Sequence, residues 1–117
     1  MADSARPGGF RGAPAIVRAG MRGRARLTDE AISAFLAAHG GWERLSESLC
    51  RTYAFDSYAA GITFVVRIGF AAEARDHHPD LLVGWRKVTV TWSTHDAGGI
   101  TALDLEMAER TDQLSRT

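Results

Sequence analysis

The sequence predicts an α+β fold in which a four-stranded antiparallel sheet is covered by three helices. Segments typical of strands come in two adjacent pairs, at 42–55 and 81–94. Helical periodicity occupies three segments around those pairs, which gives the order α-β-β-α-β-β-α. Strands grouped as hairpins favour an antiparallel sheet over a parallel one. The chain has 117 residues, 45% of them hydrophobic, which is the size of a single domain.

The first helix and the first hairpin have clear local signals. Thr28 is placed to cap a helix over Asp29–Ala38, whose acidic first turn suits the helix dipole. The glycine pair at 40–41 ends this helix. Apolar side chains then recur over 42–46 and 49–55, on either side of a polar turn, which predicts a β-hairpin.

The middle helix is predicted over Tyr58–Arg75, with Asp56 or Ser57 as its cap, and it is apolar around most of its circumference. Only Thr63 and Arg67 form a polar wedge. A helix that covers one face of a sheet needs only one apolar stripe. We therefore expect the surplus surface to form a subunit interface, with a cofactor groove as the weaker alternative.

The second hairpin is predicted over 81–85 and 86–94, and its second strand has the strictest alternation in the chain. A glycine pair at 98–99 predicts a turn, and Thr101 is the expected cap of a final amphipathic helix over about 102–114. The apolar face of the second strand consists of Val88, Val90 and Trp92.

The formal neutrality of the chain hides two unlike parts. There are 14 basic and 14 acidic residues, but residues 1–26 hold six arginines against one aspartate, so residues 27–117 have a formal charge of −5. We predict a disordered basic tail or upstream extension at 1–26, with Met21 as an alternative start, and one folded domain at 27–117. The arginine-rich, acid-poor leader also resembles an organellar transit peptide.

Composition excludes several classes of function. Zero net charge removes the simplest argument for nucleic-acid binding. No apolar run reaches the ~18 residues of a membrane span. The single cysteine, Cys50, allows no intrachain disulfide and is interpreted as a core residue. We therefore predict a cytoplasmic protein that binds neither nucleic acid nor membrane.

Three of the four histidines, His77, His78 and His95, lie at the ends of predicted elements, where reactive side chains are common. Histidine exchanges protons near neutral pH, so this trio suits acid–base chemistry. Two alternatives stay open: an exposed polar loop, which composition alone slightly favours, and a zinc site of three histidines plus water. The fourth, His39, is interpreted as a residue that complements the dipole at the end of the first helix.

Two other motifs are weak. The glycine pair at 98–99 lacks the surrounding pattern of a phosphate-binding loop. Residues 93–96 place serine, histidine and aspartate side by side, but the members of a catalytic triad must meet in space, so adjacency in sequence is no evidence for one.

A wider pattern closely resembles that of the pterin-4a-carbinolamine dehydratase family. It comprises the run EARDHHPD at 73–80, Trp85, the segment STHDAGGIT at 93–101, and Asp104. Trp85 lies ten residues before His95 and Asp104 lies nine after it, as in that family's pattern. The similarity covers residue 27 to about 114. It implies a four-stranded sheet with three helices and assembly into a homodimer or homotetramer, which would use the apolar middle helix.

The resemblance also implies an activity. Members dehydrate 4a-hydroxytetrahydropterin to quinonoid dihydropterin, without a metal or organic cofactor, and so recycle the pterin of aromatic amino acid hydroxylases. Loss of the hydroxyl requires one proton to be delivered and another to be removed, so an acid and a base must flank the substrate. By resemblance, His77 and His78 lie closest to the leaving hydroxyl and His95 completes the pocket. Which histidine is the acid and which the base stays open.

The resemblance assigns supporting roles as well. Glu73 and Asp76 are expected to lie near the histidine pair and to orient an imidazole. Leu81 departs from the pattern, since many members have a tryptophan at this position, and we expect weaker pterin stacking there. The remaining residues assigned to the site or to its substrate-binding segment are Pro79, Trp85, Thr94, Asp96, Ala97 and Asp104.

A second function remains as an alternative: a non-catalytic dimerisation or regulatory module of the same fold. Some members of the family are dimerisation partners of a homeodomain transcription factor. The apolar middle helix would serve a protein partner in the same way. An aromatic amino acid hydroxylase is a further expected partner of an active dehydratase.

Overall fold

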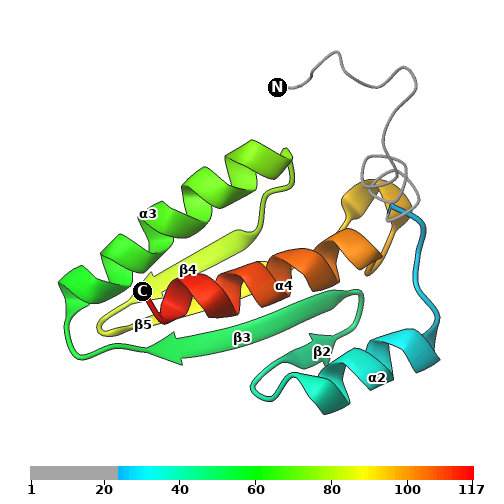
Figure 1. The fold of residues 1–117 in the computed structure, drawn as a ribbon, viewed down its shortest axis with the longest axis horizontal. Helices are drawn as coiled ribbons and strands as arrows, with labels where there is room; N and C mark the ends of the chain where they lie inside the picture. Colours follow the sequence, from blue (N-terminus) through cyan, green and yellow to red (C-terminus); the bar gives the residue numbers. More distant parts are fainter. Residues whose placement is uncertain (1–23) are drawn as a thin grey trace.

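The computed structural model describes residues 24–117 (Figure 1) and confirms the predicted fold class. Within these residues, three helices and four strands follow one another in the predicted order, and a single 3-10 turn precedes the last helix. The elements are α2 (Asp29–Ala38), β2 (Glu43–Leu45), β3 (Ser48–Ala54), α3 (Tyr58–Arg75), β4 (Asp80–Gly84), β5 (Lys87–Trp92), η1 (His95–Ala97) and α4 (Ala102–Ser115).

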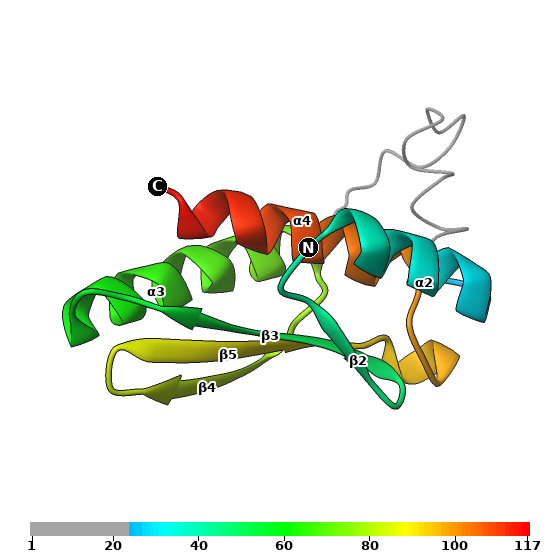
Figure 2. The same ribbon diagram turned by 90° about the horizontal axis from the view of Figure 1, so that it is seen from below.

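The molecule has two layers. The four strands form one antiparallel sheet in the order β2-β3-β5-β4. All three helices cover the same face of this sheet, and the other face has no covering element among the described residues (Figure 2). The register pairs Leu49 with Trp92 on the two central strands and Asp80 with Thr91 on the next pair, at the end where the chain passes from α3 into β4. The ends of α3 and β5 therefore lie close together.

The core lies between the helices and the sheet. The alternation predicted for the second hairpin is confirmed, because Val88, Val90 and Trp92 are fully buried while Thr89 and Thr91 are only half-buried. Helices contribute the other half of the core, chiefly through Ile32, Phe64, Ile68, Leu103, Met107 and Ala108.

The helix ends determine how the chain enters the loops. Thr28 Oγ1 accepts a hydrogen bond from Ala31 N at 3.1 Å, as expected of a cap. Ser57, one of the two predicted caps of α3, plays the same role for Ala60 N. At the other end of α3, Asp76 adopts a left-handed conformation with φ of 50°, and its N–H closes the last turn. This turn directs the next residues, His77 and His78, away from the helix axis.

The outer face of α3 is apolar, as the sequence predicts. Phe64 and Ile68 enter the core, whereas Phe70 is 74% exposed, and Tyr58 and Val66 are also exposed. Despite this, no helix within residues 24–117 is long and apolar enough to cross a bilayer. The apolar surplus is therefore an open surface of the described chain.

Most of the predicted tail, residues 1–23, lies outside the described residues. Arg26, which the prediction places in the tail, forms an antiparallel bridge with Thr101. Leu27 N also donates to Ile100 O at 2.9 Å. These contacts hold the first described residues against the segment that leads into α4.

Candidate functional site

His77 is the most enclosed of the three predicted histidines. It follows the left-handed end of α3, and its own N–H donates to Ala72 O at 3.1 Å. The residue is 7% exposed, and its ring stacks on Trp92 with centroids 5.5 Å apart and planes at 19°. Its Nε2 lies 2.6 Å from Oδ1 of Asp104, which comes from α4. A histidine just after the C-terminal end of α3 is thus hydrogen-bonded to a carboxylate in the first turn of α4.

Asp104 is the centre of this polar cluster and has no exposed surface. It occupies the third position of α4, where its Oδ2 accepts from Thr101 N at 2.9 Å in a capping box. Thr94 Oγ1 donates to the same oxygen at 2.8 Å. A buried carboxylate is costly unless such donors surround it, and here both oxygens are used.

The partners of Asp104 define the hydrogen positions on the His77 ring. A carboxylate oxygen can only accept hydrogen bonds, and Asp104 also accepts from Thr94 Oγ1 and Thr101 N. Nε2 of His77 is therefore the donor in its contact with Asp104. Nδ1 of His77 is then the ring nitrogen left to exchange a proton with another molecule. The carboxylate also balances the positive charge that the ring acquires when Nδ1 is protonated.

His78 has a different environment. Its side chain is exposed, and Nε2 lies 2.8 Å from Oε1 of Glu73, one turn back on α3. The structure therefore brings Glu73 next to the histidine pair, whereas Asp76 supplies the left-handed turn between them. Ion pairs this exposed contribute little to stability, so the contact chiefly limits the orientations of His78. Pro79 directly precedes β4.

His95 belongs to the short turn η1 between β5 and α4. Thr94 and Gly99 exchange backbone hydrogen bonds across the base of this loop, at 3.0 and 3.3 Å. His95 and Asp96 point into solvent, and Ala97 is half-buried. The buried hydroxyl of Thr94 ties the loop to Asp104, so the predicted substrate-binding segment and the His77 pair share one anchor.

Trp85 lies apart from the other predicted site residues. It occupies the turn between β4 and β5, at the end of the hairpin opposite His78 and Pro79, roughly 15 Å along the strand. It is 73% exposed, and the guanidinium of Arg86 lies 4.9 Å from its ring centroid. Leu81, at the position where many members have tryptophan, packs against the core. Trp85 therefore forms no aromatic wall beside the histidines of its own chain.

The sequence patterns did not indicate Trp92 as a neighbour of His77, nor Thr111 as the partner of that tryptophan. The alternation predicts only that Trp92 faces the core, whereas in the structure its indole also stacks beside the imidazole of His77, nearly parallel and offset. Thr111 accepts a hydrogen bond from the indole Nε1 at 3.0 Å. An inward tryptophan directly before the loop of His95 was the available signal, but alternation alone does not say which side chain it meets.

The zinc alternative finds no support in the described part of the chain. Within residues 24–117, no group of three or more His, Cys, Asp and Glu side chains is placed to hold a metal ion. His77 and His78 instead face separate carboxylates, Asp104 and Glu73.

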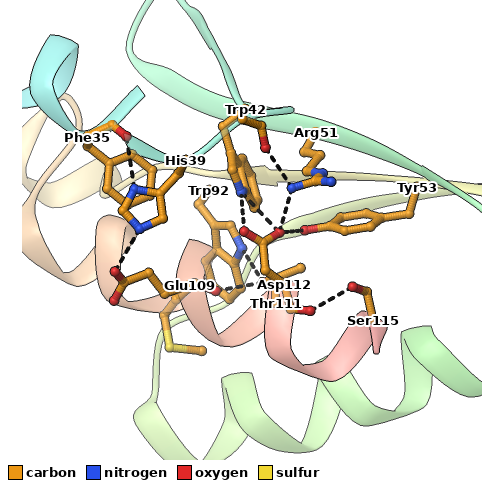
Figure 3. Close-up of polar contacts among 12 residues, drawn as sticks. Phe35, His39, Trp42, Arg51, Tyr53, Trp92, Glu109, Thr111, Asp112 and Ser115 are labelled. Atoms are coloured by element: carbon orange, nitrogen blue, oxygen red, sulfur yellow. Dashed lines mark hydrogen bonds and ion pairs between the residues drawn. The ribbon is translucent and has the colours of Figure 1, made fainter. Parts of the chain in front are cut away.

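A second polar cluster lies two turns further along α4, around Asp112 (Figure 3). Its carboxylate accepts from Trp42 Nε1 at 3.1 Å, from Arg51 Nη1 at 3.0 Å and from the hydroxyl of Tyr53. Burial, and then the hydrogen bond to Asp112, raise the pKa of Tyr53 above its usual range. All four groups are mutually satisfied, which is typical of a structural cluster.

His39 lies beside this cluster, at the end of α2 (Figure 3). Its Nδ1 donates to Phe35 O at 2.9 Å, and its Nε2 lies 2.9 Å from Glu109. The ring also stacks on Phe35 at a centroid distance of 4.0 Å. The position predicted for His39, at the carbonyl end of the first helix, is therefore confirmed. That its positive form complements the helix dipole stays a prediction.

Comparison with known sequences gives a consistent result. The family model for pterin 4 alpha carbinolamine dehydratase matches residues 25–114. A protein of Natronomonas pharaonis, provisionally named pterin-4-alpha-carbinolamine dehydratase, is 47% identical over 90 residues, which are 77% of this chain and 96% of that protein. A protein of Mycobacteroides abscessus with the same provisional name is 50% identical over 88 residues, or 75% and 94% of the two chains.

Solved structures share the fold. A transcriptional coactivator/pterin dehydratase from Brucella melitensis matches with a TM-score of 0.74 and 30% identity, over 77% of this chain and 98% of that one. A pterin dehydratase-like protein described as a RuBisCO assembly factor in the alpha-carboxysome matches with a TM-score of 0.56 and 25% identity, over 66% and 92%. Since the family model and these relatives cover most of the described residues, the chain belongs to the pterin 4 alpha carbinolamine dehydratase family.

Proposed function

We propose that this protein dehydrates 4a-hydroxytetrahydropterin, such as 4a-hydroxytetrahydrobiopterin, to quinonoid dihydropterin and water by histidine acid–base catalysis. Family membership supports the substrate class. The observation that carries the mechanism is the buried pair of His77 and Asp104, with His78 and Glu73 beside it. A buried carboxylate that orients an imidazole is a recurrent arrangement for proton transfer.

The reaction breaks the bond between C4a and its hydroxyl oxygen and the N–H bond at N5. The electron pair of the N–H bond forms the double bond between N5 and C4a, and the leaving oxygen takes up a proton to become water. One imidazole delivers that proton, and a second removes the proton from N5. Atoms and electrons balance without an oxidant, so the step needs no redox cofactor.

His77 exchanges its proton through Nδ1 in this proposal. Its Nε2 is held by Asp104, and the carboxylate stabilises the imidazolium form that appears during the cycle. His78 and Glu73 form the exposed partner pair on the solvent side of the same turn. In this proposal His95, which is exposed on the loop after β5, supplies the third histidine beside the pterin.

The loop of His95 supplies the binding surface for the pterin edge. Thr94 fixes the base of the loop, and the backbone of Asp96 and Ala97 offers donors and acceptors to the ring. Asp76 and Pro79 shape the opposite side, because they set the path of the chain before and after the histidine pair. We place the reaction in the cytoplasm, in the recycling of pterin for an aromatic amino acid hydroxylase.

The decisive experiment mixes purified protein with synthetic 4a-hydroxytetrahydropterin and follows formation of the quinonoid product by its absorbance. His77→Ala should lower the rate by on the order of 10²–10⁴. His39→Ala is the matched control, because that histidine lies outside the site. If wild-type protein does not accelerate the dehydration, or if His77→Ala retains full activity, the assignment is wrong.

We further propose that α3 forms the interface of a homodimer or homotetramer. The supporting observation is its exposed stripe of Tyr58, Val66 and Phe70. Phe70→Glu should shift the protein to monomers in analytical ultracentrifugation. Phe64 is unsuitable for this test because it is 1% exposed and belongs to the core. A monomeric wild type would remove the proposal.

The alternative function is a non-catalytic binding module. It draws support from the exposed face of α3 and from the described role of one structural relative in RuBisCO assembly. Activity separates the two functions, because a module requires neither His77 nor Asp104. A partner that copurifies with wild type and His77→Ala, but not with Phe70→Glu, together with no dehydratase activity, would favour the module.

A further inference from the structure

We propose that Trp92 and Thr111 are positioning residues for His77: the indole sets the plane of the imidazole, and Thr111 prevents the indole from turning. The inference rests on the proposed function only in that His77 exchanges a proton with substrate. Neither residue belongs to the histidine and carboxylate pattern discussed above. Both are buried, so they act through His77 rather than by touching the pterin.

One hydrogen bond does not fix an imidazole. The contact between Nε2 of His77 and Asp104 holds one ring atom, but it leaves the ring free to rotate about that bond. Rotation would carry Nδ1, on the other side of the ring, through an arc. The Trp92 indole restricts this rotation, because it stacks on one side of the ring with centroids 5.5 Å apart and planes only 19° apart. Together the two contacts define where Nδ1 points.

The indole is itself held by a directed hydrogen bond. Trp92 Nε1 donates to Thr111 Oγ1 at 3.0 Å, and the Thr111 hydroxyl donates its own hydrogen to Met107 O at 2.6 Å (Figure 3). Because the hydroxyl hydrogen of Thr111 points to Met107 O, a lone pair of the hydroxyl oxygen accepts the indole N–H. Turning the indole over would leave a buried N–H without an acceptor, so the ring has one orientation.

One helix supplies both Asp104, which contacts His77 directly, and Thr111, which holds Trp92. Asp104 and Thr111 are seven residues apart on α4, which is two helical turns or about 10 Å along the axis. Side chains at that spacing lie on one face. A single rigid element therefore sets both the hydrogen bond and, through Trp92, the stacking plane. Misplacement of a reacting group by about 1 Å can cost 10²-fold in rate, so such restraint has a kinetic consequence.

Thr111→Val tests this chain of contacts, because valine keeps the shape of threonine and removes the acceptor of the indole. We expect kcat to fall about tenfold while KM changes by less than about twofold, since the pterin contacts are unchanged. Thr111→Ser keeps the hydroxyl and should retain wild-type kcat. Trp92→Phe keeps a stacked ring without the N–H and should give an intermediate loss.

A second readout requires no activity. The ring protons of His77, assigned by their loss in His77→Gln, should resonate upfield in wild type because they lie over the indole. In Thr111→Val we expect these NMR signals to shift toward ordinary histidine positions or to broaden, and in Thr111→Ser to stay. Circular dichroism and thermal unfolding verify that each variant is folded. If Thr111→Val does not fold, Trp92→Phe carries the same test.

The outcomes separate this inference from the proposed function. An inactive wild type whose His77 signals move in Thr111→Val overturns the dehydratase proposal and supports the positioning role. An active wild type in which Thr111→Val and Trp92→Phe leave both kcat and the His77 signals unchanged overturns the positioning role alone.

Discussion

Two carboxylates on the sheet-facing side of α4, Asp104 and Asp112, are built into the molecule in similar ways but differ in what they hold. Each accepts hydrogen bonds from side chains brought by other elements. Around Asp112 the donors are an indole, a guanidinium and a phenol, and none has a further proton to exchange near neutral pH. Around Asp104 one donor is an imidazole, whose second nitrogen remains available.

This difference shows that a buried carboxylate can serve two purposes in the same fold. A buried carboxylate saturated by permanent donors ties secondary-structure elements together. The same carboxylate facing a histidine also controls the tautomer and the charge of a group that can act on a substrate. Loss of Asp112 should therefore be visible mainly in stability, and loss of Asp104 mainly in rate.

The largest expected effect is the loss of dehydration rate when Asp104 is substituted. Asp104→Asn preserves size but removes the charge that stabilises the protonated His77 ring, so we expect kcat to fall by at least about 10²-fold. Asp112→Asn, two turns away, is the matched control and should keep kcat within about threefold of wild type in the folded protein. Equal losses of kcat in the two variants would erase the distinction between the clusters.

The next effect is on stability at the Asp112 end. Asp112→Ala leaves the indole of Trp42, the guanidinium of Arg51 and the hydroxyl of Tyr53 without their shared acceptor. We expect the free energy of unfolding to fall by about 3 kcal/mol, measured by urea denaturation. A loss below about 1 kcal/mol would mean that water replaces the carboxylate and that the cluster is not a structural tie.

The pH dependence of stability separates the clusters further. The pKa of Tyr53 is raised by burial and by Asp112, so the folded protein keeps this proton at pH values where the unfolded chain loses it. The stabilisation is complete below pH 10 and is lost as the pH rises above 10, by up to about 1.4 kcal/mol per pH unit. Denaturation between pH 9 and 11 measures it, and Tyr53→Phe should remove this part of the slope. An unchanged slope in Tyr53→Phe would contradict the assignment.

The smallest effect concerns the loop that carries His95. A methyl group added at Gly99 would lie 2.8 Å from Glu47 Oε1 and 3.0 Å from Arg26 Nε, so Gly99→Ala must displace that exposed ion pair. Because the ion pair is exposed and flexible, we expect a loss of less than about 1 kcal/mol in unfolding free energy. The loss should shrink in a Glu47→Ala background, where the nearer of the two obstructing groups is absent and Arg26 has lost its ion-pair partner. Equal losses in both backgrounds would place the strain in the backbone instead.

The sequence was most informative where the determining forces are local. The predicted bounds of α2 and α3 agree with the structure, because caps at Thr28 and Ser57 and the helical periodicity act within a few residues. The alternation in β5 likewise identified its buried face. The contact of Glu73 with His78 spans only five residues, and the helix end brings the two together without help from the rest of the fold.

Tertiary structure decided everything that depends on which faces meet. The partners His77 and Asp104 are 27 residues apart, and only the packing of α4 against the end of α3 brings them together. The same packing made Trp92 a neighbour of His77. The register of the β4–β5 hairpin, which is local, places Trp85 at the turn and so at the end away from His77. Local patterns by themselves determined the helices, the strands and the residue types available for chemistry. Only the packing of the helices on the sheet determined which ring nitrogen of His77 is bound by Asp104 and which is left for a substrate. The physical reason is that burial and hydrogen-bond partners arise between elements that are distant in sequence.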